Sequence, residues 1–214
     1  MDILASIIAL AIAITVHEAA HAWMSDRLGD PTARLMGRLS LNPIKHIDLY
    51  GTVLVPLLLI IARSPLLFGW AKPVMFDPYN LKNPRKDGAL IALSGPVSNM
   101  IVAVLLSILF RLVNSPFTPA NFLSVLLIYT ITVNVTLGIF NFIPIHPLDG
   151  GKIFIGLLPN KDALEADRFM NRYGLLILLF LIFPFFGKVS PINAVIAPVI
   201  NFILNLLITR SGFV

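Results

Sequence analysis

Six long apolar runs occupy most of this 214-residue chain and leave it few ways to fold. They cover residues 3–24, 52–68, 89–112, 122–145, 169–186 and 192–209. A helix needs about 20 apolar residues to cross a lipid bilayer, and most of these runs approach or exceed that length. Hydrophobic residues make up 57% of the sequence and charged residues only 13%, unlike a water-soluble domain. We therefore expect an all-α polytopic membrane protein, with residues 1–214 forming a single embedded domain in the cell membrane.

Basic residues gather in three of the connections between these runs, at 25–50, 69–88 and 146–172. Loops rich in lysine and arginine stay on the cytoplasmic side of a membrane, so we expect all three to face the cytoplasm. Contact with anionic lipid headgroups explains the formal net charge of +5 without a nucleic-acid partner. Cysteine is absent, which excludes disulfides and thiolate metal sites.

The run at 52–68 cannot cross the bilayer once if the loops on both its sides are cytoplasmic. It is also short, and it contains Pro56 and Arg63. We expect a re-entrant or β-hairpin element near residues 51–75, covered by protein or water, with short strands at 51–53 and 72–74. Five transmembrane helices then remain, which would place the two termini on opposite faces of the membrane. A sixth span is the alternative.

A metal-binding pattern, His17-Glu18-Ala19-Ala20-His21, lies inside the first apolar run. Residues four apart share one face of a helix, so His17 and His21 can bind one ion with Glu18 beside them. Two imidazoles and a nearby carboxylate suit zinc, and the glutamate can deprotonate a water molecule at the ion. The structural alternative is that both histidines only form hydrogen bonds within a packed helix bundle and bind no ion. Ionisable side chains at membrane depth are costly, however, and usually functional.

A second polar motif ends the fourth run, where Pro144 and Pro147 precede Asp149 and a pair of glycines. Proline lacks a backbone donor and disfavours helix before it, so we expect the helix to break and hold Asp149 on a bent segment. Asp149 is then the obvious third ligand, although an ordinary Asp-Gly turn uses the same residues. If 52–68 re-enters, Asp149 and both histidines lie toward the cytoplasmic side. With a sixth span, Asp149 would lie on the opposite side.

Two asparagines and the two remaining histidines also need an interpretation. Asn141 could donate a hydrogen bond to the oxyanion that develops during acyl transfer. Asn99 and His146 are candidates for a second shell around the ion. Either asparagine could instead form a hydrogen bond between two helices and have no role at the ion. His46 is expected in a loop or at the membrane interface.

Together these motifs resemble the site-2 protease family of intramembrane zinc metalloproteases, in its compact prokaryotic form. The resemblance extends over about residues 3–152, and three segments carry it. They are HExxH at 17–21, SGPxxN at 94–99 and NxxPxxPLDGG at 141–151. HExxH alone occurs in many metalloproteases, but HExxH in a membrane helix followed by Leu-Asp-Gly at a second helix end is specific to this family.

The resemblance implies a zinc metalloendopeptidase that cleaves transmembrane protein substrates in regulated intramembrane proteolysis, with its active site toward the cytoplasm. It implies one Zn²⁺ per chain, with these residue roles: ligands His17, His21 and Asp149, general base Glu18, and oxyanion donor Asn141. The catalytic core would be about residues 3–152, with accessory helices at about 169–209 and no PDZ or CBS module. His146 departs from the family pattern, in which a proline or another non-ligating residue is expected.

Two other functions use the same residues. A zinc carrier or channel could place these ligands along a transport path, but no internal repeat is found, and the last two runs carry almost no further ligands. A catalytically silent relative that only binds membrane helices should have lost Glu18 or a ligand, and none is lost. The substrate, its cleavage site, the activating signal and the oligomeric state do not follow from the sequence.

Overall fold

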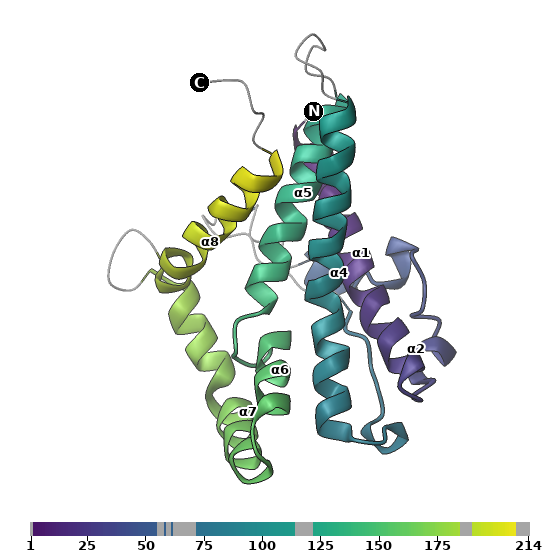
Figure 1. Cartoon of the computed structure of the whole chain (residues 1–214), viewed down its shortest axis with the longest axis vertical. Coiled ribbons are helices and arrows are strands. Elements are labelled where there is room, and N and C mark those ends of the chain that lie inside the picture. The colour runs from purple at the N-terminus through teal and green to yellow at the C-terminus, as the bar shows by residue number, and fades with distance from the viewer. Residues whose placement is uncertain are drawn as a thin grey trace.

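The computed structural model describes residues 2–54, 58, 61, 72–113, 122–184 and 190–208, most of them helical (Figure 1). The long helices and the short α6 are α1 (Asp2–Arg27), α4 (Pro84–Val113), α5 (Phe122–Asn141), α6 (Asp149–Leu157), α7 (Asn160–Ile182) and α8 (Pro191–Ile208). The short elements are α2 (Thr32–Leu35), η1 (Pro43–Lys45), η2 (Leu49–Leu54) and η3 (Pro78–Asn80). Helices α1, α4 and α5 pack against one another, and α4 runs antiparallel to the other two. This three-helix unit forms the body of the molecule.

One buried stripe runs along α1. Every fourth residue from 5 to 25 is buried, in the order Ala5, Ala9, Ala13, His17, His21 and Ser25. Residues four apart lie on one helix face, and small residues let helix backbones approach closely in a membrane. Both histidines of the HExxH motif therefore lie on the face that packs against the rest of the bundle.

Helices α4, α5 and α8 share an apolar core. Its buried members are Ala103, Phe110, Leu127, Ile131 and Val135, and Ile200, Ile203, Leu204 and Leu207 of α8 pack against them. At the end of α4, Arg111 Nη2 donates a hydrogen bond to the Leu206 carbonyl oxygen at 2.5 Å. The end of α8 is thus fixed beside the end of α4.

In the part of the chain that the structure describes, four helices are long and apolar enough to cross a membrane: α1, α4, α5 and α8. The expected five or six spans are not confirmed, because α7 begins with polar turns and only its second half is apolar. Figure 1 shows α7 and α8 rising one after the other. Because α1 is antiparallel to α4, the start of α1 lies at the same end as Arg111 and the end of α8. The start of α1 and the end of α8 therefore lie at the same end of the helix bundle, and the membrane faces of the two termini stay a prediction.

Most of the run at 52–68 lies outside the described residues, so its re-entry stays a prediction. The strands expected beside it are not found among the described residues. Leu49–Leu54 forms a π-helical turn, and 72–77 has no regular secondary structure. The reason for the first difference is local: Asp48 Oδ1 accepts hydrogen bonds from the amides of Tyr50 and Gly51, at 3.1 and 2.7 Å. A carboxylate that binds the next amides favours a helical turn over an extended chain.

Candidate metal centre

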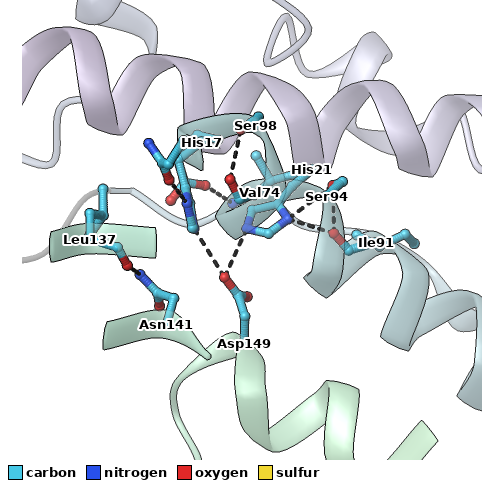
Figure 2. Close-up of polar contacts among 12 residues, drawn as sticks. His17, His21, Val74, Ile91, Ser94, Ser98, Leu137, Asn141 and Asp149 are labelled. Carbon is cyan, nitrogen blue, oxygen red and sulfur yellow. Dashed lines mark hydrogen bonds and ion pairs between the residues drawn. The ribbon is translucent and has the colours of Figure 1, made fainter. Parts of the chain in front are cut away.

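His17, His21 and Asp149 converge where α1 meets the first turn of α6 (Figure 2). Asp149 Oδ2 lies 3.0 Å from His17 Nε2 and 3.3 Å from His21 Nε2. One ligand atom from each residue lies within 4.8 Å of the others. The two imidazole rings are almost perpendicular, at 88°. The structure thus brings together three side chains that the sequence separates by more than a hundred residues.

The outer nitrogen of each imidazole is bound by α4. His17 Nδ1 lies 2.6 Å from Asn99 Oδ1, and His21 Nδ1 lies 2.7 Å from the Ile91 carbonyl oxygen. A carbonyl oxygen only accepts, so Nδ1 of His21 carries the hydrogen and donates it. In a neutral ring, this leaves the lone pair on Nε2, the atom that faces Asp149. Such hydrogen bonds fix the tautomer and orientation of metal-binding histidines.

The centre of this cluster contains acceptors and lacks a donor. Asp149 Oδ2 is buried and accepts no hydrogen bond from the described residues. Two imidazole lone pairs and a carboxylate oxygen that face one another need a cation or extra protons between them. Two imidazoles and one carboxylate are also the ligand set of many catalytic zinc sites, with a fourth position left for water or substrate. The residues present therefore fit a zinc ion.

A tight turn between α5 and α6 places Asp149. Helix α5 ends at Asn141, and Asp149 is the first residue of α6, as the prolines between them predict. The two glycines that follow Asp149 are needed for close packing. A Cβ at Gly150 would lie 2.2 Å from the Ile143 carbonyl oxygen, and one at Gly151 would lie 2.8 Å from His146 Nδ1. The turn can pack on α6 only because these side chains are absent.

Gly95 of α4 lies directly against the two imidazole rings. A Cβ there would lie 2.5 Å from His21 Cε1 and 2.7 Å from His17 Cε1. These distances are far below normal carbon–carbon contacts, so a side chain at this position would displace both imidazoles. Gly95 thus leaves the space that the two rings occupy.

Glu18 is half-buried beside the ligands, and a distant segment holds it. The backbone amide of Val74 donates a hydrogen bond to Glu18 Oε2 at 3.2 Å. The segment that contains Val74 is held at both ends by hydrogen bonds. The Lys72 amide donates to the His46 carbonyl oxygen at 3.0 Å, and the Asp77 amide donates to an Asp30 carboxylate oxygen at 2.9 Å. One carboxylate oxygen of Glu18 is therefore positioned by the segment that follows the apolar run at 52–68.

Asp30 is fully buried just beyond α1 and anchors this segment. Its carboxylate accepts hydrogen bonds from the hydroxyls of Ser25 and Thr32, the amides of Thr32 and Asp77, and the side chain of Asn80. Burial alone would raise the pKa of Asp30, but these hydrogen bonds outweigh it and lower the pKa to about 2. The carboxylate therefore stays ionised within the protein.

Asn141 lies near the cluster at the end of α5 (Figure 2). Its Nδ2 donates a hydrogen bond to the Leu137 carbonyl oxygen at 3.0 Å. An asparagine amide carries two hydrogens, so one is still available to a second acceptor. The position is compatible with the oxyanion role predicted for Asn141.

The comparisons with known proteins agree with this geometry. The sequence profile of Peptidase family M50 matches residues 5–181. This chain belongs to Peptidase family M50, the site-2 protease family. It is 34% identical to the proposed zinc metalloprotease YwhC of Bacillus subtilis (strain 168), over 91% of this chain and 85% of YwhC. It is 28% identical to the proposed zinc metalloprotease Rip2 of Mycolicibacterium smegmatis, over 80% of this chain and 63% of Rip2.

A third relative is the zinc metalloprotease MJ0392 of Methanocaldococcus jannaschii. It is 32% identical to this chain over 46% of the chain and 30% of MJ0392. No solved structure gave a significant match. The family resemblance predicted from the motifs is confirmed, and the chain is a zinc metalloprotease homologue with apolar helices suited to a membrane.

Two histidines of this M50 chain lie outside the ligand cluster. His146 Nε2 lies 3.5 Å from Asp167 Oδ1 of α7, so its ring pairs with that helix rather than with Asp149. His46 is in a loop, as expected, but it is only 1% exposed, and its Nε2 lies 2.8 Å from the Ser40 carbonyl oxygen. In the part of the chain that the structure describes, the recorded contacts of these two rings are with α7 and with the loop rather than with the ligands.

Three contacts in this M50 site were not predicted from the sequence. The Ile91 carbonyl and the Val74 amide are backbone groups, and every residue except proline has both, so no residue type marks them. The third is Asn134, which binds Asn99 from α5. An asparagine inside an apolar helix was the available signal, because such residues usually hydrogen-bond to a neighbouring helix.

Proposed function

We propose that this M50 protein is an intramembrane zinc metalloendopeptidase. It hydrolyses peptide bonds within or near transmembrane segments of membrane proteins, as in regulated intramembrane proteolysis. The observation that carries the proposal is the donor-free cluster of His17, His21 and Asp149 beside Glu18, near the end of an apolar helix. Its membership of family M50 supports the same activity.

In this proposal, His17, His21 and Asp149 hold one zinc ion per chain. When bound, zinc acts as a Lewis acid that polarises the scissile carbonyl and makes water a nucleophile at neutral pH. Glu18 accepts a proton from the attacking water and returns it to the leaving amine as the carbon–nitrogen bond breaks. The Val74 amide holds Oε2 of Glu18, which leaves the other oxygen to carry that proton. The second amide hydrogen of Asn141 stabilises the oxyanion.

The position of the site supports cleavage from the cytoplasmic side of the cell membrane. His17 and His21 lie nearer the end of α1 than its start, and that end leads into the first basic loop. The other two basic loops lie at the same end, because one precedes the antiparallel α4 and the other contains α6. A substrate helix has to unwind before cleavage, since its amides are bound within the helix.

A cleavage assay with a single-span membrane substrate tests this function. We expect purified wild-type protein to contain zinc and cleave the substrate. Glu18→Gln keeps a similar shape but cannot accept the proton, so we expect at least a hundredfold loss of cleavage with zinc still bound. Undiminished cleavage by Glu18→Gln would contradict the role of Glu18. A zinc-loaded wild type that transports zinc and cleaves nothing would support a carrier instead.

A further inference from the structure

Behind His17, two asparagines form a buried chain of hydrogen bonds across three helices. Asn99 of α4 and Asn134 of α5 are both fully buried. Asn99 Nδ2 donates to the Ala13 carbonyl oxygen at 3.0 Å and to Asn134 Oδ1 at 2.8 Å. Asn134 Nδ2 donates in turn to the Thr130 carbonyl oxygen at 2.8 Å. This Asn99–Asn134 chain connects the metal cluster to a helix that supplies no ligand.

The direction of the chain is fixed from its far end. The Thr130 carbonyl can only accept, so Asn134 must present its nitrogen there and its oxygen to Asn99. Asn99 then presents its nitrogen to Asn134 and to the Ala13 carbonyl, which use both of its amide hydrogens. Only its oxygen is left for His17, at 2.6 Å from Nδ1. Nδ1 of His17 must therefore be the donor, and the lone pair of the neutral ring is on Nε2.

We propose that Asn134 is a positioning residue for the metal site. Acting through Asn99, it fixes His17 in the tautomer and orientation that present Nε2 to the ion. The proposal rests on the proposed function, because it takes His17 to be a zinc ligand. At His21 the corresponding nitrogen is held by the Ile91 carbonyl oxygen, with the Ser94 hydroxyl 3.5 Å away. Among the described contacts, the Asn99–Asn134 chain reaches the site through His17.

Loss of the Asn134 side-chain oxygen should release this constraint. Asn99 would keep a buried N–H without an acceptor, which is unfavourable in an apolar interior. Asn99 would then be held at its nitrogen by the Ala13 carbonyl alone, so the His17 ring that it orients would be less firmly fixed. Loss of a residue that orients a ligand commonly lowers metal affinity about 10- to 100-fold.

The test measures zinc affinity by competition with a chelator, using full-length protein in detergent. Asn99→Leu should lower the affinity about 10- to 100-fold and Asn134→Leu about tenfold. The double variant should be no weaker than Asn99→Leu alone, because Asn134 acts through Asn99. The matched control is Thr130→Val, which loses a buried hydroxyl on the same helix but keeps the carbonyl that Asn134 binds. We expect wild-type affinity from this control.

A second readout is the absorption spectrum of the cobalt-substituted protein, which should change in Asn134→Leu and not in Thr130→Val. Asn134→Ala replaces the leucine variant if that protein does not fold. Equal zinc affinities in wild type and the Asn134 variant would overturn the proposal. So would a tenfold further loss in the double variant, because the effect would then bypass Asn99. A wild type that binds no zinc would contradict the proposed function itself, which separates the two failures.

Discussion

Asp30 is a single residue outside the metal cluster that acts on it through the backbone. Its carboxylate binds the Asp77 amide, and the segment that ends there carries the amide that holds Glu18. Asp30→Asn turns one of the two acceptor oxygens into a donor that faces other donors. We expect it to lower the free energy of unfolding by about 1–3 kcal/mol, measured by denaturant unfolding in detergent. A variant as stable as wild type would contradict the anchoring role.

The same residue predicts how stability changes in acid. The pKa of Asp30 is lowered from 3.8 to about 2 in the folded protein. A carboxyl group whose pKa is lower in the folded than in the unfolded protein stabilises the fold. This stabilisation is complete at a pH above the pKa of the unfolded state, and it is lost as the pH falls through the pKa of the folded state. The melting temperature of wild type should therefore fall between about pH 4 and pH 2, and that of Asp30→Asn should fall less. If the melting temperatures of the two proteins fell equally with pH, Asp30 would not be the cause of the loss of stability in acid.

Among the elements, α4 is the helix against which the site is assembled. It gives the Asn99 side chain to His17 and the Ile91 carbonyl to His21. It also leaves room for both rings at Gly95. The ligands therefore come from α1 and α6, whereas their orientation comes from α4.

This arrangement predicts that a single methyl group on α4 disrupts the site. Gly95→Ala places a Cβ 2.5 Å from His21, so the rings must move, and zinc affinity should fall at least about tenfold. Gly88→Ala on the same helix is the control. Its Cβ would meet only Phe76, at an ordinary 3.7 Å, so zinc affinity should not change. Chelator competition measures both, and equal affinities would contradict the close contact at Gly95.

The elements also show how far the sequence could predict the structure. The break before Asp149 was predictable because proline cannot continue a helix, and HExxH placed both histidines on one face. The prediction of a strand at 51–53 was wrong because Asp48 caps a helical turn there, and this outweighs the preference of the residues for β structure. The contacts from Val74 and Ile91 were not predictable, because they use backbone groups that every segment has.

At the scale of the molecule, both ends of the described chain lie at one end of the helix bundle, and the basic connections before α4 and around α6 lie at the other (Figure 1). We predict that these two ends of the bundle face opposite sides of the membrane. The natural absence of cysteine makes this testable by labelling single introduced cysteines in intact cells. A cysteine at Lys82 or Lys161 should react only after the membrane is permeabilised, because both positions lie in basic loops. One at Ser115, in the connection between α4 and α5, should react from outside. The same accessibility at all three positions would contradict this topology.

The central claim is that distant parts of the chain share one zinc ion. The most direct measurement is the zinc-to-protein ratio of purified protein, wild type against Asp149→Ala, by elemental analysis. We predict about one zinc per chain in wild type, because the three ligand atoms already converge, and a clearly lower ratio without the Asp149 carboxylate. An Asp149→Ala protein that keeps the full wild-type ratio would contradict the claim, and so would a wild type with no zinc.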